Sequence, residues 1–303
     1  MDILSVKNLS KRFGTHQVID TISFSVPEGS IFGFLGANGQ GKTTTMKMIL
    51  GLLPADEGEI LVCGEKVAFG ATATNRHIGY LPDVPEFYGY MRPMEYLKLC
   101  GEIVGLRGEE TKKRSKELLE MVGLGGINKK INGFSRGMKQ RLGMAQALLN
   151  EPKLLICDEP TSALDPMGRK EILDILEKIK GKTTVIFSTH ILSDVERVCD
   201  RLAVINGGSI VLAGTFEEIK SQKQVESIQI DFGSTADKDR FISLAGNLMD
   251  VSKIGEQSVC LNVSDIKAAQ KKILQILAAH EILPVKLEVL EPSLESLFLE
   301  VVS

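Results

Sequence analysis

The chain has 303 residues and a formal net charge of only −3, with no long run of Lys or Arg. This balance argues against nucleic acid as a partner, because a duplex-binding protein carries a basic surface for the phosphates. The five cysteines are widely spaced, odd in number and without a C-x-x-C pair, which argues against a disulfide framework or a zinc site.

The length allows one large α/β domain and a smaller second domain. The first residues lack the basic and apolar regions of a signal peptide. No apolar run reaches the roughly 18 residues that a membrane-spanning helix needs. We therefore expect the chain itself to be soluble and cytoplasmic.

Residues 3–26 alternate between apolar and polar side chains, for instance at Ile22, Phe24 and Val26. Such alternation predicts half-buried antiparallel strands. Residues 11–14 are expected to form the loop between them. A further short strand is expected at residues 60–62, which lie between two turn signals.

A glycine-rich stretch at residues 36–43 follows the apolar run 31–35 and precedes a helix predicted over residues 44–53. Its sequence matches the G-x-x-x-x-G-K-[ST] pattern of a phosphate-binding P-loop. Glycines let successive N–H groups approach phosphate oxygens, and the helix N-terminus adds a favourable dipole. Lys42 is expected to reach the terminal phosphates and Thr43 to bind Mg²⁺. A simple turn between a strand and a helix is the alternative. The nucleotide-binding residues expected here are Gly36, Ala37, Asn38, Gly39, Gln40, Gly41, Lys42, Thr43 and Thr44.

Three continuous apolar runs, at residues 154–157, 185–187 and 202–205, predict strands that helices cover on both faces. They indicate an α/β fold with a largely parallel central sheet, in which ligands bind beyond the carboxyl ends of the strands. Asp158 and Glu159 follow the first run. Asp158 is positioned to hold Mg²⁺ and Glu159 to orient or deprotonate a water molecule, although acidic pairs also occur in ordinary surface loops.

Residues 85–149 change character, with helical spacing at 94–104, 109–122 and 138–149. We expect a mostly helical insertion. The basic run at residues 112–114 has acidic neighbours and is interpreted as a solvated helix face. Ser135 is a predicted helix N-cap whose hydroxyl and neighbouring N–H groups could meet an anion, although an ordinary capped helix has the same pattern.

Beyond residue 215 the pattern predicts a small α+β module. Alternation at residues 228–232, 259–263 and 285–289 indicates strands. Helices are expected at residues 241–249, 266–277 and 293–302. The module contains no catalytic cluster, so packing, dimer contact or regulation are its expected roles.

Five motifs, in this order along the chain, resemble the ATP-binding subunit of an ABC transporter: residues 36–43, 134–138, 158–159, 162–165 and His190. The resemblance covers residues 1 to about 218. It implies an ABC-type P-loop fold with a mostly parallel central sheet, an antiparallel β subdomain and a helical subdomain at about 85–149. Residues 219–303 then form an accessory α+β domain.

The same resemblance implies site roles beyond the P-loop. Phe13 is expected to stack on adenine, and His190 to contact the γ-phosphate. Ser135 and Gly137 are expected to contact the nucleotide held by a second ATPase subunit. The expected catalytic residues are therefore Glu159, His190 and Lys42.

Two departures from the family pattern stand out. The signature is Phe-Ser-Arg-Gly-Met instead of Leu-Ser-Gly-Gly-Gln, which retains Ser135 and Gly137. After Tyr80-Leu81-Pro82 the chain has Asp83 where the family has Gln. An ionised carboxylate cannot donate a hydrogen bond, and it adds negative charge near the metal. Asp83 is retained with Thr43 and Asp158 as a candidate metal ligand.

The resemblance implies hydrolysis of ATP with Mg²⁺ by a homodimer or heterodimer of ATPase subunits. A separate membrane permease is expected to dock near residues 83–90 and to hold the chain at the inner face of the cell membrane. Residues 291–299 are similar to the tails of bacterial ATPases that serve export permeases, which favours a drug, antibiotic, peptide or lipid-like substrate.

The alternative is a soluble ABC ATPase that acts on ribosomes or DNA. Such proteins carry two cassettes, or a long coiled coil between P-loop and signature, and the sequence has neither. A nucleotide sensor with an inactive site is a third reading, against which the presence of Lys42 and Glu159 argues.

Overall fold

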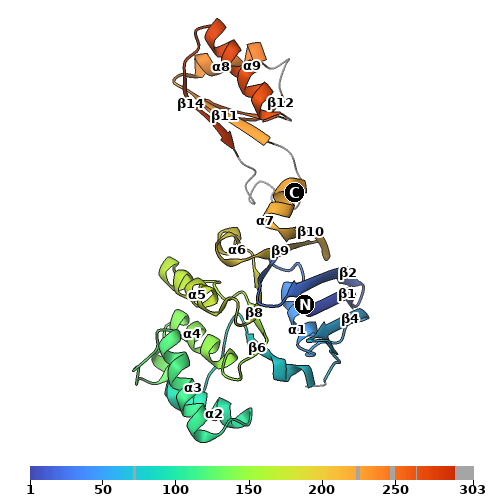
Figure 1. The fold of residues 1–303 in the computed structure, drawn as a ribbon, viewed down its shortest axis with the longest axis vertical. Helices are drawn as coiled ribbons and strands as arrows, with labels where there is room; N and C mark the ends of the chain where they lie inside the picture. Colours follow the sequence, from blue (N-terminus) through green and yellow to red (C-terminus); the bar gives the residue numbers. More distant parts are fainter. Residues whose placement is uncertain (71–72, 223–225, 246–249, 264, 291–303) are drawn as a thin grey trace. The chain divides into compact units, whose positions relative to one another are not determined.

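The computed structural model describes residues 1–70, 73–222, 226–245, 250–263 and 265–290. The chain divides into two compact units, unit 1 at Met1–Phe216 and unit 2 at Glu217–Ser303. Figure 1 traces the elements of both units in sequence colours. Within the described ranges, no helix has both the length and the apolar character needed to cross a membrane.

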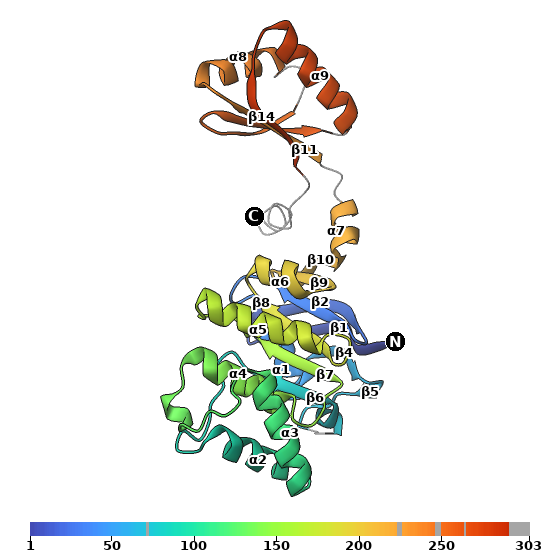
Figure 2. The ribbon, with the colours of Figure 1, turned by 60° about the vertical axis from the view of Figure 1, so that its left-hand side comes forward.

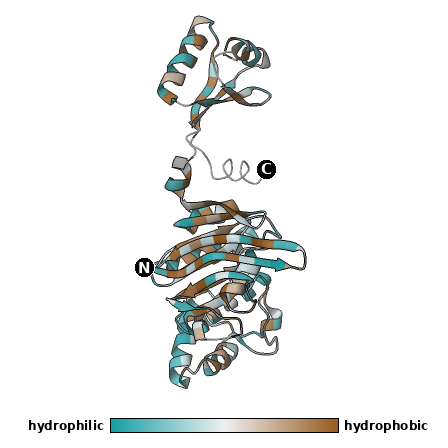
Figure 3. Cartoon of the chain, turned by 90° about the vertical axis from the view of Figure 1, so that its right-hand side faces the viewer, coloured by the Kyte–Doolittle hydropathy of each residue, from teal (hydrophilic) through white to brown (hydrophobic). Residues whose placement is uncertain are grey.

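Unit 1 begins with an antiparallel sheet of order β2-β1-β4-β5. Its strands are β1 (Asp2–Phe13), β2 (His16–Pro27), β4 (Glu57–Val62) and β5 (Glu65–Lys66). Hydrophobic and hydrophilic residues alternate along these strands in Figure 3, as the sequence predicts for a half-buried sheet.

The predicted loop at residues 11–14 was wrong for residues 11–13, because β1 continues to Phe13, which pairs with His16, and the turn occupies residues 14–15. The end of the strand is held by Asp56. One carboxylate oxygen of Asp56 lies 2.7 Å from Lys11 Nζ, and the other accepts a hydrogen bond of 2.7 Å from the Arg12 backbone N–H. Polar residues that resemble a loop in the sequence therefore extend the strand.

The central sheet of unit 1 has the order β10-β9-β3-β8-β7-β6. The strands are β3 (Ile31–Leu35), β6 (Ile78–Leu81), β7 (Leu154–Asp158), β8 (Thr184–Thr189), β9 (Arg201–Asn206) and β10 (Ser209–Thr215). All neighbours are parallel except β10, which is antiparallel to β9. The predicted α/β class and largely parallel sheet are confirmed. Strand β6 escaped prediction because it is short and contains Gly79.

Helices cover both faces of the central sheet, and Figure 2 shows α5 running across it. These helices are α1 (Lys42–Ile49), α5 (Pro166–Ile179) and α6 (Leu192–Val198). One hydrophobic core lies between the two sheets and includes Met46 and Met48 of α1. The Phe24 ring stacks on Phe32 there and is tilted against Phe34, with centroid distances of 5.6 and 5.3 Å.

Helix α1 begins and ends earlier than its prediction over residues 44–53. It starts at Lys42, so both Lys42 and Thr43 belong to its first turn. It stops at Ile49 because Gly51 adopts a positive φ of 69°, a conformation that ends helices.

The predicted helical insertion is present. Its elements are α2 (Pro93–Ile103), α3 (Gly108–Met121), the 3₁₀ helix η2 (Ile131–Gly133) and α4 (Arg136–Ala147). The short 3₁₀ helix η1 (Ala73–His77) lies before β6 and outside the predicted insertion. Lys112 and Lys113 are exposed on α3, which confirms a solvated helix face. Ser135 is the N-cap of α4, and its hydroxyl accepts a hydrogen bond of 3.2 Å from the Met138 N–H.

Helix α7 begins at the last residue of unit 1 and continues into unit 2. The rest of unit 2 has a βαββαβ arrangement. Its elements are α7 (Phe216–Gln222), β11 (Glu226–Phe232), α8 (Thr235–Ala245), β12 (Asp250–Ile254), β13 (Ser258–Val263), α9 (Ile266–Ala279) and β14 (Pro284–Leu290). The sheet order β12-β13-β11-β14 with all pairs antiparallel is that of a split βαβ fold. Phe232, Phe241 and Ile273 lie in its core.

The predicted α+β module is thus confirmed, with two differences. Helix α8 starts at Thr235, not at residue 241, because the Ser234 hydroxyl accepts a hydrogen bond of 3.1 Å from the Asp237 N–H and caps its first turn. Strand β12 was not predicted. The predicted helix at residues 293–302 lies outside the described residues, as do residues 246–249.

Gly79 in β6 allows this strand to lie directly against the end of α4. A Cβ atom at Gly79 would lie 2.0 Å from the Ala147 carbonyl oxygen, which is backbone and cannot move aside. We expect Gly79→Ala to lower the free energy of unfolding by about 1–3 kcal/mol, the usual cost of overpacking. Urea denaturation measures this change.

Gly108→Ala is the matched control, since Gly108 begins α3 and a Cβ there would meet nothing within 4 Å. It should leave the free energy of unfolding unchanged or raise it slightly. Equal urea midpoints for the two variants would contradict the close packing of β6 on α4.

Candidate functional site

The glycine-rich loop between β3 and α1 depends on glycine at particular positions. Gly41 has φ +97°, and a Cβ there would lie 2.4 Å from Ile19 Cδ1. Gly39 also has a positive φ, of 84°. Gln40 fastens the loop to the β9–β10 turn, because its Oε1 accepts a hydrogen bond of 2.7 Å from the Gly207 N–H. The loop therefore has a defined backbone conformation, and a residue larger than glycine at position 41 would clash with Ile19.

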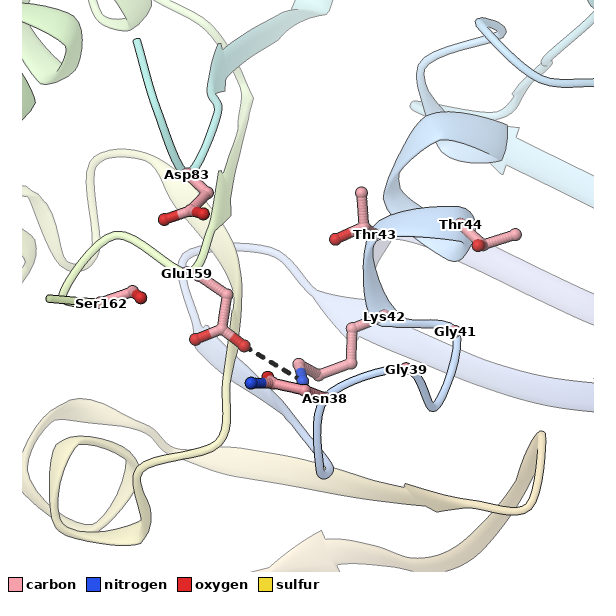
Figure 4. A pocket seen from close by; sticks show the side chains of 9 residues that line it. All are labelled: Asn38, Gly39, Gly41, Lys42, Thr43, Thr44, Asp83, Glu159 and Ser162. Atoms are coloured by element: carbon pink, nitrogen blue, oxygen red, sulfur yellow. Dashed lines mark ion pairs between the residues drawn. The ribbon is translucent and has the colours of Figure 1, made fainter.

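A pocket of about 330 Å³ opens above this loop. Figure 4 shows the loop and the start of α1 on one side of it, with Asp83, Glu159 and Ser162 on the other. The residues that line it are Asn38, Gly39, Gly41, Lys42, Thr43, Thr44, Asp83, Glu159 and Ser162. The first turn of α1 has no side-chain cap, so its free N–H groups can meet an anion.

Lys42 is buried at the floor of this pocket, with only 5% of its surface exposed. Its Nζ donates to the carbonyl oxygens of Gly36 at 2.7 Å and Ala37 at 3.1 Å. The same atom lies 3.0 Å from Glu159 Oε1. The loop thus holds the Lys42 ammonium in a fixed position beside the acidic end of β7.

Glu159 is held at several points just after β7. It adopts a positive φ of 48°. Its N–H donates to the carbonyl oxygen and the hydroxyl of Ser188, at 3.1 and 3.0 Å. Its carboxylate contacts Lys42 through Oε1 and His190 Nδ1, at 2.9 Å, through Oε2. The carboxylate therefore lies between a cation and an imidazole at the edge of the pocket.

Ser188 is a site residue that the sequence analysis missed. Its hydroxyl donates a hydrogen bond of 2.6 Å to Asp158 Oδ1 while accepting one from the Glu159 N–H. It thereby fixes both acidic residues. Its place in the polar triplet at the end of β8 was the signal that could have identified it. Ser162, which lines the pocket, was noted only as part of a motif.

A second, buried network joins the segments that follow β7 and β8. Asp194 in α6 is 2% exposed and accepts hydrogen bonds of 2.6 Å from the Thr161 hydroxyl and from Arg169 Nη2. Because a buried carboxylate needs such partners, this network locks the two segments together. It stabilises the backbone that carries Glu159 and His190.

Asp83 enters the pocket from the segment after β6. Its Oδ1 accepts a hydrogen bond of 3.2 Å from Arg136 Nη2, and its carbonyl oxygen accepts one of 2.6 Å from Gln140 Nε2. Burial raises the pKa of Asp83, an effect that Arg136 opposes and that the Asp158 and Glu159 carboxylates strengthen. Asp83 therefore places a carboxylate at the edge of the pocket, and Arg136 of α4 partly balances its charge.

A divalent metal ion fits this donor set in a limited way. The described residues contain no group of three His, Cys, Asp or Glu side chains placed to hold a metal. Mg²⁺, however, usually takes one or two protein oxygens and completes its shell with phosphates and water. Thr43 lines the pocket. Asp158 is buried and directly precedes the pocket-lining Glu159 in the sequence. This donor chemistry suits magnesium held together with a phosphate ligand.

The other predicted site residues lie apart from this pocket's lining. Ser135 and Gly137 begin α4, and the nearest atom to a Cβ at Gly137 would be Leu164 Cδ2, at 4.0 Å. Phe13 is half exposed at the end of β1, with Lys11 Nζ 5.5 Å from its ring centroid. The structure therefore brings Lys42, Thr43, Asp83 and Glu159 together, and it leaves Phe13, Ser135 and Gly137 elsewhere on unit 1.

Comparison with known proteins places this chain in a family. The family described as ABC transporter matches residues 19–162. The linearmycin resistance ATP-binding protein LnrL of Bacillus subtilis (strain 168) is 36% identical over 304 residues, covering 98% of this chain and 97% of that protein. The bacitracin transport ATP-binding protein BcrA of Bacillus licheniformis is 34% identical, covering 99% and 97%.

Among solved structures, an ATP-binding cassette described as dimeric, in a post-hydrolysis state bound to ADP and Pi, is 26% identical. It superposes with a TM-score of 0.63 over 70% of this chain and 98% of its own. The predicted α/β P-loop fold is thereby confirmed. The two relatives named above match this chain almost end to end. The ATP-binding cassettes of the ABC transporter family hydrolyse ATP, and the chain belongs to this family as an ATP-binding subunit.

Proposed function

We propose that the chain hydrolyses ATP with Glu159, Lys42 and His190 as its catalytic residues, and that hydrolysis drives a separate membrane permease. The observation that carries this proposal is the Glu159 carboxylate between Lys42 and His190 at the pocket edge. A carboxylate held there can orient or deprotonate water beside a phosphate bound on the loop. Lys42 contributes a positive charge for the terminal phosphates, and His190 a contact to the γ-phosphate.

The P-loop residues bind the phosphates in this proposal. N–H groups of the loop and of the start of α1 provide donors, which the positive φ angles of Gly39 and Gly41 orient. The N–H groups of Gly36 and Gln40 are not among them, because they already donate to backbone carbonyl oxygens. Thr43 and Asp158 would hold Mg²⁺, which offsets phosphate charge when bound. Asp83 stays a weaker metal candidate, because its carboxylate already bonds Arg136. Phe13, half exposed, would stack on the adenine ring.

A second ATPase subunit would complete the site. Ser135 and Gly137 are outside the pocket lining but begin a helix, α4, whose N-terminus can meet phosphate. They are therefore suited to close over the nucleotide of a partner, identical or different. The dimeric form of the related cassette bound to ADP and Pi supports this arrangement.

A membrane permease is the second proposed partner, and it would hold the chain at the inner face of the cell membrane. Its docking surface is proposed at residues 83–90, where Val84, Tyr88 and Tyr90 are more than half exposed. Exposed aromatic and apolar side chains in one segment favour protein contact. Residues 1–218 would form the ATP-binding domain, with its helical subdomain at about 85–149, and residues 219–303 an accessory domain.

Export of an antibiotic, drug, peptide or lipid-like compound is the proposed direction of transport. The names of the two end-to-end relatives, linearmycin resistance and bacitracin transport ATP-binding proteins, support it. Those names describe the relatives. Their likeness covers unit 2 as well as unit 1, which favours a related permease type for this chain.

Glu159→Gln tests the water-activating role. The variant should bind ATP with normal affinity but turn it over about 10²–10⁴-fold more slowly, since the amide cannot accept a proton. Single-turnover hydrolysis of radiolabelled ATP measures the chemical step. Glu196→Gln, an exposed change on α6, is the control and should be fully active. A wild-type rate in Glu159→Gln would remove Glu159 from the mechanism.

Lys42→Ala tests the phosphate contact. Loss of the buried ammonium should weaken ATP binding and reduce turnover by at least about tenfold, because a charged hydrogen bond to phosphate is lost. Lys47→Ala, an exposed change on the same helix, should leave both unchanged. Calorimetric titration with ATP gives the affinities. Equal affinities in Lys42→Ala and Lys47→Ala would contradict the assignment.

Export is tested by expressing the chain together with the membrane protein encoded beside its gene in a sensitive bacterium. We expect the pair to raise the inhibitory concentration of bacitracin or of linearmycin, and the same pair with Lys42→Ala to give no increase. Accumulation assays should show less antibiotic in cells with the intact pair. Unchanged sensitivity to a broad compound panel would argue against export.

A further inference from the structure

We propose that Arg136 is a positioning residue for Asp83. Its guanidinium balances the charge of an acid at the edge of the phosphate pocket and fastens that edge to helix α4. Both residues are departures from the family pattern, and nothing in the sequence connects them. In the structure they bond to each other. This inference rests on the proposed nucleotide site, whose charge makes the pair consequential.

Asp83 is contacted at two points, by two residues on consecutive turns of α4. Arg136 Nη2 donates to the Asp83 carboxylate at 3.2 Å, and Gln140 Nε2 donates to the Asp83 carbonyl oxygen at 2.6 Å. Residues four apart lie on the same face of a helix, so one face of α4 holds both the side chain and the backbone of Asp83. Gln140 is fully buried, which makes the second point rigid.

The next turn of α4 continues this contact through close packing. A Cβ at Gly143 would lie 2.6 Å from Leu81 Cδ1 and 3.3 Å from Pro85 Cβ. Glycine therefore lets the segment around Asp83 lie directly on the helix. The backbone position of Asp83 is set by Gln140 and Gly143, which leaves the direction and charge of its carboxylate to Arg136.

Charge at the pocket explains why a balancing group is needed. Asp83 and Glu159 both line the pocket, where Lys42 is the lining cation. Lys42 already contacts Glu159, at 3.0 Å. A triphosphate brought into this space meets the Asp83 carboxylate as a like charge, and like charges disfavour binding. Arg136 offsets that repulsion from outside the lining.

The pair also links two functional positions within one chain. Asp83 lines this chain's own pocket, and Arg136 follows Ser135, the N-cap of α4. A shift of the Asp83 segment on ligand binding would therefore act on the start of α4 through this ion pair. Because both side chains are more than 40% exposed, the ion pair itself should add little to folding stability. Its loss should change ligand binding more than stability.

The test measures ATP binding to the full-length chain, by calorimetric titration with EDTA and again with MgCl₂. Arg136→Gln should weaken metal-free binding about three- to tenfold, the effect of one partly screened charge. The loss should be smaller with MgCl₂, since the cation offsets the same charge. Asp83→Gln should bind metal-free ATP as well as or better than the unaltered chain. The double variant should bind like Asp83→Gln alone.

Two controls separate this role from a structural one. Thermal unfolding midpoints of the variants should match the unaltered chain. Arg76→Gln, which breaks the exposed Arg76–Glu65 ion pair outside the pocket lining, should leave ATP affinity unchanged.

Normal metal-free binding by Arg136→Gln would overturn the inference while leaving the proposed function intact. A loss that persists undiminished in the double variant would also overturn it, because Arg136 would then act through a group other than Asp83. Failure of the unaltered chain to bind ATP would overturn both the inference and the proposed function.

Discussion

The contact between Lys42 and Glu159 depends on the order of the strands in the central sheet. Lys42 follows β3 and Glu159 follows β7, and β8 lies between these two strands. Ser188 and His190, at the end of β8, therefore reach Glu159 from the middle position. Parallel strands place all three carboxyl ends at one edge, where each short polar sequence meets the others. A different strand order would separate the same residues, however well each motif were preserved.

Much of this architecture could be predicted where local chemistry decides the structure. Continuous apolar runs identified β7, β8 and β9, and the capping serine identified the start of α4 at Ser135. Prediction failed where a distant partner decides. Lys11 and Arg12 are held in a strand because Asp56, 44 and more positions away, bonds to both. Strand β6 is stabilised by its neighbour β7 and by packing on α4, and neither is visible in its four residues.

The candidate site shows the same division. The P-loop was found from its own local pattern, whereas Asp158, Glu159 and His190 gained their roles from their place in the ordered set of motifs that resembles the family. Ser188 was missed because its role is to bridge two residues of another strand. The bond between Asp83 and Arg136 could not be predicted, since a single sequence cannot show that two unusual residues, far apart in the chain, compensate for one another. Only the packing of the Asp83 segment on α4 reveals their relation.

The anchoring of the glycine-rich loop has a consequence for molecular recognition. Gln40 bonds the β9–β10 turn, Gly41 packs against Ile19, and the Lys42 side chain is bonded to the loop's own carbonyl groups. Fixing the backbone of a flexible residue costs about 1–2 kcal/mol of conformational entropy. In this loop that ordering accompanies folding, so a ligand meets a preorganised surface. Differences in affinity between ligands should then report their own contacts and charges, with little contribution from rearrangement of the loop.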